Sequence, residues 1–278
     1  MEHAADAEDE FLDLFRSRYG TRQFDRWHGW RYARAVDALH TARLALNPAY
    51  LGLRAKAARM PARRVLVTAV DVPGRRADLD GVVRALQDSR HEVAVRLAPM
   101  GDRGKFQNIN AALEGVDMGA YDWLLVTDDD VVLPPRFLDL FLCVAEGADL
   151  RVCQPAHRFH SHASWAVTQR AWNSLAHVTH YVETGPMTAF HKSFFPLCLP
   201  FPNTRWAWGV DVLWSEAARR RGWRIGVVDA TPIEHVREIA QSYAREAAIV
   251  EAQQLLATNG VRRNSRELMR TVEVVRRL

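Results

Sequence analysis

Three consecutive acidic residues follow a short apolar run, and their spacing suits the binding of a cation. The run is Trp123–Thr127, and Asp128, Asp129 and Asp130 come directly after it. Apolar and β-branched residues of this kind predict a strand that is buried on both faces. Because side chains alternate along an extended chain, Asp128 and Asp130 are expected to share a side, while Asp129 points towards a ribose hydroxyl or a backbone amide. The pattern indicates a divalent metal site, since neighbouring carboxylates otherwise repel; the alternative is a solvated acidic turn.

Four segments, in a fixed order, carry a resemblance to a known family. They are GKFQNIN at Gly104–Asn110, the three acids with the VVLPPRF that follows them, WGVD at Trp208–Asp211, and PIEH at Pro232–His235. Over residues 63–237 the chain resembles the nucleotide-sugar-dependent glycosyltransferases of the GT-A fold, in particular family 2. The resemblance implies an α/β, Rossmann-like fold with a mixed, mostly parallel sheet flanked by helices, and with helical N- and C-terminal extensions.

The order of the predicted elements divides the chain into three regions. Residues 1–62 carry apolar side chains at helical spacing and predict an N-terminal helical extension. Strand and helix signals alternate over 63–237, which predicts a largely parallel sheet with helices on both faces. The resemblance assigns 63–135 to nucleotide binding and 136–237 to the acceptor. Residues 238–278 are rich in charge and predict a C-terminal helical hairpin over the core.

The first predicted strand ends in an acid. Arg64–Val70 predicts a strand, a helix is expected from about Ala77 to Ser89, and Glu92–Ala98 predicts the second strand. Ligands of a doubly wound sheet bind beyond the carboxyl ends of the strands, so Asp71 is expected at the mouth of the cleft. The resemblance implies that Asp71 binds a base edge or a sugar hydroxyl; the alternative is a carboxylate that caps its own turn.

Basic and amide side chains near Gly104 suit an anionic ligand. A helix is expected to start near Lys105, and both the helix start and the lysine charge favour a diphosphate, which Arg103 and Lys105 would hold. Asn110 is expected to fix the loop that bears the acids through amide hydrogen bonds. The alternatives are a surface lysine and an asparagine buried within the helix.

The resemblance also implies a set of metal ligands. Asp128 and Asp130 would bind the ion, and His235 resembles the further ligand of some members, reached through a short proline-containing loop after the strand Ile225–Asp229. Oxygen ligands suit Mg²⁺ or Mn²⁺, and an added imidazole favours Mn²⁺. The alternative is a structural histidine.

Asp211 resembles the general base of the family, which takes the proton of the attacking hydroxyl. An enzyme that retains the anomeric configuration would use Asp211 to bind acceptor or sugar instead, and a helix N-cap is the structural alternative. Glu183 and Gly185 belong to a segment that resembles the loop facing the donor sugar and acceptor. Trp208 could stack on a sugar ring or pack in the core.

Other histidines and the cysteines do not indicate a metal site. His157, His160 and His162 have irregular spacing and predict a polar loop that lines the cleft. The three cysteines are odd in number and lack a C-x-x-C pair. They are expected to be reduced, buried thiols.

Charge and hydropathy restrict the location and the partners. The chain has 278 residues and a formal net charge of +4, and it shows no recognised nucleic-acid motif, so nucleic acid is not an expected partner. No run approaches the ~18 apolar residues of a membrane span, and Met1–Glu10 is acidic, so a cytoplasmic location is expected. The run Phe24–Tyr32 could rest on a membrane surface or pack its tryptophans on the catalytic domain. A homodimer is left open.

The resemblance as a whole predicts a metal-dependent transfer of a sugar from a UDP- or GDP-linked donor to an acceptor hydroxyl. Two alternatives are kept. A GT-A-like nucleotidyltransferase should carry a glycine-rich phosphate loop after the first strand, where this chain has only Gly74. A non-catalytic module that binds carbohydrate or nucleotide is the other, because a fold alone does not prove turnover.

Overall fold

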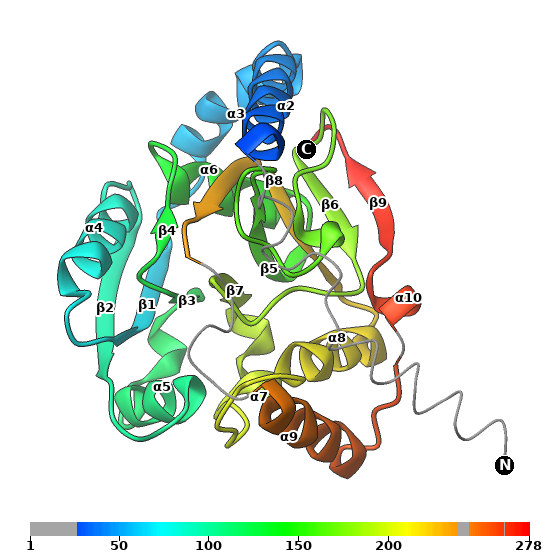
Figure 1. Ribbon diagram of the computed structural model, residues 1–278. Coiled ribbons are helices and arrows are strands. Elements are labelled where there is room, and N and C mark those ends of the chain that lie inside the picture. Colours follow the sequence, from blue (N-terminus) through cyan, green and yellow to red (C-terminus); the bar gives the residue numbers. More distant parts are fainter. Residues whose placement is uncertain (1–26, 238–244, 264) are drawn as a thin grey trace, which may run out of the picture.

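The computed structural model describes residues 27–237, 245–263 and 265–278, and within them nine strands form one mixed sheet (Figure 1). Its first three strands are parallel: β1 (Arg64–Asp71) lies between β2 (Glu92–Pro99) and β3 (Trp123–Thr127). The helices α4 (Arg76–Gln87) and α5 (Lys105–Leu113) follow β1 and β2 along the chain. The predicted strands at 64–70, 92–98 and 123–126 are therefore confirmed.

The second half of the sheet mixes parallel and antiparallel neighbours. The strand β7 (Met187–His191) runs antiparallel to both β3 and β5 (Leu150–His157), whereas β8 (Arg224–His235) is parallel to β5. The strand β6 (Ala176–Thr179) lies antiparallel on the other side of β8. The predicted mixed sheet flanked by helices is confirmed.

Helices cover both faces of the sheet, and alternate residues of β1 show how. Val65 and Val67 belong to one apolar cluster, together with residues of α4 and α6 (Phe137–Gly147). Leu66 belongs to a second cluster, together with residues of α5 and of α8 (Val210–Arg221). Period-two alternation thus sends successive side chains to opposite apolar layers, as expected for a strand that is buried on both faces.

Further short elements connect these layers. They are the helix α7 (Phe195–Cys198), the strand β4 (Val131–Val132), and the 3₁₀ turns Met118–Ala120, Ala166–Thr168 and Lys192–Phe194. All three cysteines are free and buried, as predicted. Among the described residues, no helix has the length and apolar character needed to cross a membrane.

The N-terminal extension is helical where it is described. Helices α2 (Trp27–Ala45) and α3 (Pro48–Arg59) lie together at the top of the molecule in Figure 1. Leu44, Leu53 and Ala57 join the same apolar cluster as α6. The extension therefore shares the core of the sheet, and its boundary near residue 62 stays a prediction.

The predicted C-terminal helical hairpin is wrong. After α9 (Arg245–Thr258) and the single turn α10 (Ser265–Leu268), the chain forms the strand β9 (Thr271–Val275), which pairs antiparallel with β6 at the edge of the sheet. The sequence TVEVV has strong strand propensity, and Val275 is buried in the main core. The many charged residues of 238–278 favour helix, and the short strand pattern at 271–275 is the exception.

Candidate active site

The three acids leave the carboxyl end of β3 and lie in a bend between β3 and β4. The strand β4 pairs antiparallel with the end of β8, so that Val131 lies opposite His235. His235 is thus the last residue of a continuous twelve-residue strand, and the prediction that it follows a separate loop is wrong. The pairing brings His235 to the acids from a position more than one hundred residues later in the chain.

Asp130 and His235 form a nearly buried pair. His235 Nε2 lies 3.2 Å from Asp130 Oδ2, and each side chain is 10 % exposed. Burial disfavours both charges, but the contact between the two groups outweighs it, raising the pKa of His235 and lowering the pKa of Asp130. His235 Nδ1 donates to the carbonyl of His162 at 3.2 Å, which fixes the ring with Nε2 towards the acid.

Asp128 has a different partner. Its Oδ1 lies 2.6 Å from Lys105 Nζ, which also donates to the carbonyl of Thr184 at 3.3 Å. A Cβ atom on Gly185 would lie 2.9 Å from Asp128 Oδ2 and 3.3 Å from Lys105 Nζ. Only glycine therefore fits beside this ion pair without displacing it.

Asp129 contacts arginine side chains, and its expected contact with a ribose hydroxyl stays a prediction. Its Oδ1 lies 3.1 Å from Arg237 Nη1 and 4.0 Å from Arg75 Nη1. Burial is the main reason that the pKa of Asp129 is raised, and the two guanidinium groups oppose that shift. The chain bends at 129–130, and each of the three acids has its own partner; Asp128 and Asp130 both act on His235, whereas Asp129 contacts arginines.

The described residues contain no ready-made group of three or more His, Cys, Asp or Glu side chains that could hold a metal ion. Two of the predicted metal ligands, Asp130 and His235, nevertheless suit a metal ion. Asp130 Oδ1 is buried without a hydrogen-bond partner, beside an imidazole whose Nδ1 is already engaged. An unpaired buried carboxylate oxygen next to a ring nitrogen suits a divalent ion. Asp128 would become a further ligand of that ion if its ion pair with Lys105 were broken.

Asp211 is buried near the start of α8. The N-cap of that helix is Gly209, in a left-handed conformation with φ 82°, so the N-cap alternative for Asp211 is wrong. Asp211 Oδ2 accepts a hydrogen bond from the Tyr181 hydroxyl at 2.7 Å, and Oδ1 accepts one from the amide of Val212 at 2.9 Å. Burial raises the pKa of Asp211 to about 7 despite these hydrogen bonds.

Glu183 connects Asp211 with the metal-ligand candidates. Its charge contributes to the raised pKa of both Asp211 and His235. Glu183 Oε2 lies 3.1 Å from His157 Nε2, and the ring of His157 lies 6.2 Å from that of His235. His157 is fully buried in β5, so the prediction that it belongs to a cleft-lining loop is wrong.

The remaining predicted residues lie in several places. Asp71, at the end of β1, forms an ion pair with Arg76, with 2.6 Å between Oδ2 and Nη1. Trp208 packs against the apolar cluster that contains residues of α8 and α9. Asn110 exchanges two hydrogen bonds with the backbone of Phe201, at 2.8 and 2.9 Å, so it fixes that segment and not the acid-bearing loop. Arg103 and Asn110 line a separate cavity of about 690 Å³ beside α5.

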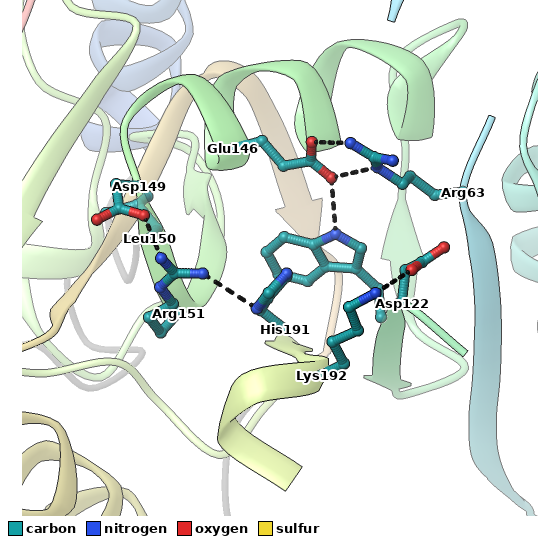
Figure 2. Close-up of a pocket in the computed structure, with 9 residues that line it drawn as sticks. Arg63, Asp122, Glu146, Asp149, Leu150, Arg151, His191 and Lys192 are labelled. Carbon is teal, nitrogen blue, oxygen red and sulfur yellow. Dashed lines mark hydrogen bonds and ion pairs between the residues drawn. The ribbon is translucent and has the colours of Figure 1, made fainter. Parts of the chain in front are cut away.

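A second polar cavity lies at the opposite end of β3, where the strand begins with Trp123 (Figure 2). It measures about 330 Å³, and its charges are paired: Arg63 with Glu146, Lys192 with Asp122, and Arg151 with Asp149. This arrangement stabilises the strand ends and offers no unpaired charge to a ligand.

Sequence reasoning missed two residues of the site, Tyr181 and Arg237, and it assigned His157 to a loop although this residue lies in β5. Each owes its place to a partner that is distant in the chain, such as Asp211 for Tyr181. Only the position of Tyr181 two residues before Glu183, in a segment already singled out, could have indicated one of them.

Comparison with known proteins assigns the family. Residues 52–249 match the family described as glycosyltransferase like family 2, whereas no curated protein matches the chain. A Pyrobaculum calidifontis mannosyltransferase solved with GDP-Man and Mn²⁺ has a TM-score of 0.47 and 17% identity, over 84% of this chain and 77% of that one. The catalytic domain of Drosophila β1,4-galactosyltransferase 7 with xylobiose has a TM-score of 0.42 and 11% identity, over 69% and 81%. The family match covers well over half of the residues, so the chain belongs to the family described as glycosyltransferase like family 2 and is a glycosyltransferase.

Proposed function

We propose that this enzyme moves a sugar from a UDP- or GDP-linked donor to an acceptor hydroxyl, with a divalent ion at Asp130 and His235 and with Asp211 as the base. One observation supports the proposal most strongly. The segment 183–185 is close to both halves of the site: the charge of Glu183 adds to the raised pKa of Asp211 and of His235, its Oε2 lies 3.1 Å from His157 Nε2, and a Cβ on Gly185 would lie 2.9 Å from Asp128 Oδ2.

Asp130 and His235 would hold the ion, with Asp128 as a further ligand. The carboxylate and imidazole donors favour Mn²⁺ over Mg²⁺. When bound, such an ion neutralises the negative charge that develops on the departing nucleoside diphosphate. Lys105 pairs with Asp128, and it would be free to bind the diphosphate if Asp128 served as a metal ligand instead.

Several cations lie close enough to the acids to help bind the donor. Arg75 and Arg237 contact Asp129, and Arg76, the first residue of α4, pairs with Asp71 at the end of β1. Arg103 precedes the N-cap Gly104 of α5 but lines the cavity beside that helix. We assign the diphosphate to Lys105 and to the guanidinium groups that contact Asp129, and the base or ribose to Asp71; a role for Arg103 at the diphosphate requires its side chain to leave that cavity.

Asp211 takes the proton of the attacking hydroxyl. A carboxylate with a pKa of about 7 is partly ionised at neutral pH and is a stronger base than an ordinary aspartate. Tyr181 donates to Oδ2 and fixes the rotation of the carboxyl group.

A direct displacement of this kind inverts the anomeric centre; in a retaining enzyme Asp211 would bind the acceptor. Glu183 and Trp208 would then border the sugar. A cytoplasmic location and a homodimer stay predictions.

A thermal-shift panel tests the proposal. UDP-, GDP-, dTDP- and ADP-sugars are each added with and without Mn²⁺ to the enzyme, to Asp130→Asn, and to the matched control Asp88→Asn, whose carboxylate is exposed at the end of α4. We expect stabilisation that requires both nucleotide sugar and metal, that is lost in Asp130→Asn, and that remains in Asp88→Asn.

Two results would contradict the proposal. Stabilisation by nucleoside triphosphates with release of pyrophosphate would identify a nucleotidyltransferase. No response to any nucleotide, from enzyme that is folded by circular dichroism, would identify a non-catalytic module.

A further inference from the structure

The outer side of α2 carries an apolar stripe that no described residue covers. Tyr32, Leu39 and Leu46 are 74, 60 and 72 % exposed, and Leu51 on α3 is 66 % exposed. These are the four most exposed large hydrophobic side chains among the described residues. Isolated exposed apolar residues are ordinary, but four on one helical pair form a patch.

The spacing of these residues places them on one face of the helix. Tyr32, Ala35, Leu39 and Ala42 recur every three or four residues, so that they fall within an arc of about 80° on α2, and Leu46 follows in the turn directly after the helix. The exposed alanines between the larger side chains keep the stripe continuous.

The opposite side of α2 is anchored to the protein. Asp37 accepts a hydrogen bond from His160 at 2.6 Å and contacts Arg170, and both acidic oxygens are buried. His40 packs edge-on against Phe159 and Trp172. The helix is therefore held with its stripe outward, and rotating the stripe inward would break these contacts.

The charged side chains that α2 and α3 expose are all cationic. Over residues 29–59 the basic side chains are all exposed, and the only acid, Asp37, is buried. The basic residues are Arg31, Arg34, Arg43, Arg54, Lys56 and Arg59.

We propose that the stripe and its surrounding cations, which together we call the α2 face, adsorb to the surface of an anionic lipid bilayer. Apolar side chains enter the acyl boundary while arginine and lysine meet lipid phosphate, which is the usual pattern of a helix that lies in a membrane interface. The sequence had left contact by Phe24–Tyr32 open. Residues 24–26 lie outside the described ranges, and the α2 face extends further along the chain, to Leu46.

Charge argues against two other occupants. A second copy docked through the same face would bring six cations against six with no exposed acid to pair them. Nucleic acid would use the cations but would leave the apolar stripe exposed to water.

Co-sedimentation of the full chain with vesicles tests the proposal, using phosphatidylcholine alone and phosphatidylcholine mixed with phosphatidylglycerol. We expect binding only to the mixed vesicles, and weakening at high salt. Leu39→Glu should reduce binding at least about tenfold, whereas Val250→Glu, a matched change at an exposed valine of α9, should not. The double variant Arg31→Gln, Arg43→Gln should weaken binding by about fivefold for each arginine removed. The control is the double variant Arg276→Gln, Arg277→Gln, which should not show this loss.

Four results would overturn the proposal. They are the absence of binding to the mixed vesicles, binding that is unchanged by Leu39→Glu, an oligomer that Leu39→Glu converts to a monomer, and binding to duplex nucleic acid that survives Leu39→Glu. The outcome does not depend on the proposed chemistry, because no residue of the α2 face belongs to the candidate active site. Leu39→Glu should keep the thermal response to nucleotide sugar that the unchanged enzyme shows.

Discussion

At the residue scale, the hydrogen bond from Tyr181 to Asp211 controls the strength of the proposed base. Burial raises the pKa of Asp211 to about 7, and the tyrosine hydroxyl counteracts part of that rise. Tyr181→Phe removes the donor, so the pKa of Asp211 should rise further. Because the base acts in its ionised form, the acidic limb of the kcat/KM profile should move to higher pH by about one unit, with about a tenfold loss near neutral pH.

The control for this change is Tyr121→Phe, since Tyr121 packs against the α5 and α8 side of the core without a described contact to Asp211. Its pH profile should match that of the unchanged enzyme. An acidic limb that stays in place in Tyr181→Phe would argue that another group accepts the proton.

A second prediction at the residue scale concerns Gly185, which leaves room for the ion pair between Asp128 and Lys105. An alanine there would bring its Cβ within 2.9 Å of Asp128 Oδ2, and the carboxylate can move because it ends a partly exposed side chain. Stability should change by less than about 1 kcal/mol, while displacement of Asp128 should lower kcat/KM for the donor about 10- to 100-fold.

Gly52→Ala is the matched control, because nothing lies within 4 Å of the added Cβ and α3 is a helix. It should keep full activity and gain stability of up to about 1 kcal/mol. Full activity in Gly185→Ala would mean that the position of Asp128 is unimportant for the donor.

At the scale of elements, β9 contributes to the core although it lies at the edge of the sheet. Val275 is buried beside Ala176 of β6, with which it pairs. Val275→Ala should lower the free energy of unfolding by about 2 kcal/mol, whereas Val272→Ala, at a 54 % exposed position of the same strand, should change it by less than about 0.5 kcal/mol. Urea unfolding followed by circular dichroism measures both, and equal effects would mean that β9 does not pack on β6 in solution.

At the scale of the whole molecule, local sequence patterns predicted where strands and helices lie, but they did not predict which side chains contact one another. The mostly apolar and β-branched runs at 65–70 and 123–126 identified central strands because burial on both faces requires such composition. The partners of Asp128, Asp129 and Asp211 could not be predicted, because Lys105, Arg237 and Tyr181 reach them only through tertiary packing. β9 was not predicted although TVEVV favours a strand, because its place in the sheet depends on pairing with β6, far earlier in the chain.

The two-residue ladder between β4 and β8 fixes which side chain of β8 faces the acids. Side chains alternate along β8, so sliding that strand by a single residue would turn His235 away and offer Glu234 in its place, a carboxylate among carboxylates. The identity of the group that meets Asp130 is consequently encoded in main-chain hydrogen bonds. Insertions or deletions within 224–235 should therefore be far more damaging to the chemistry than most single side-chain changes there.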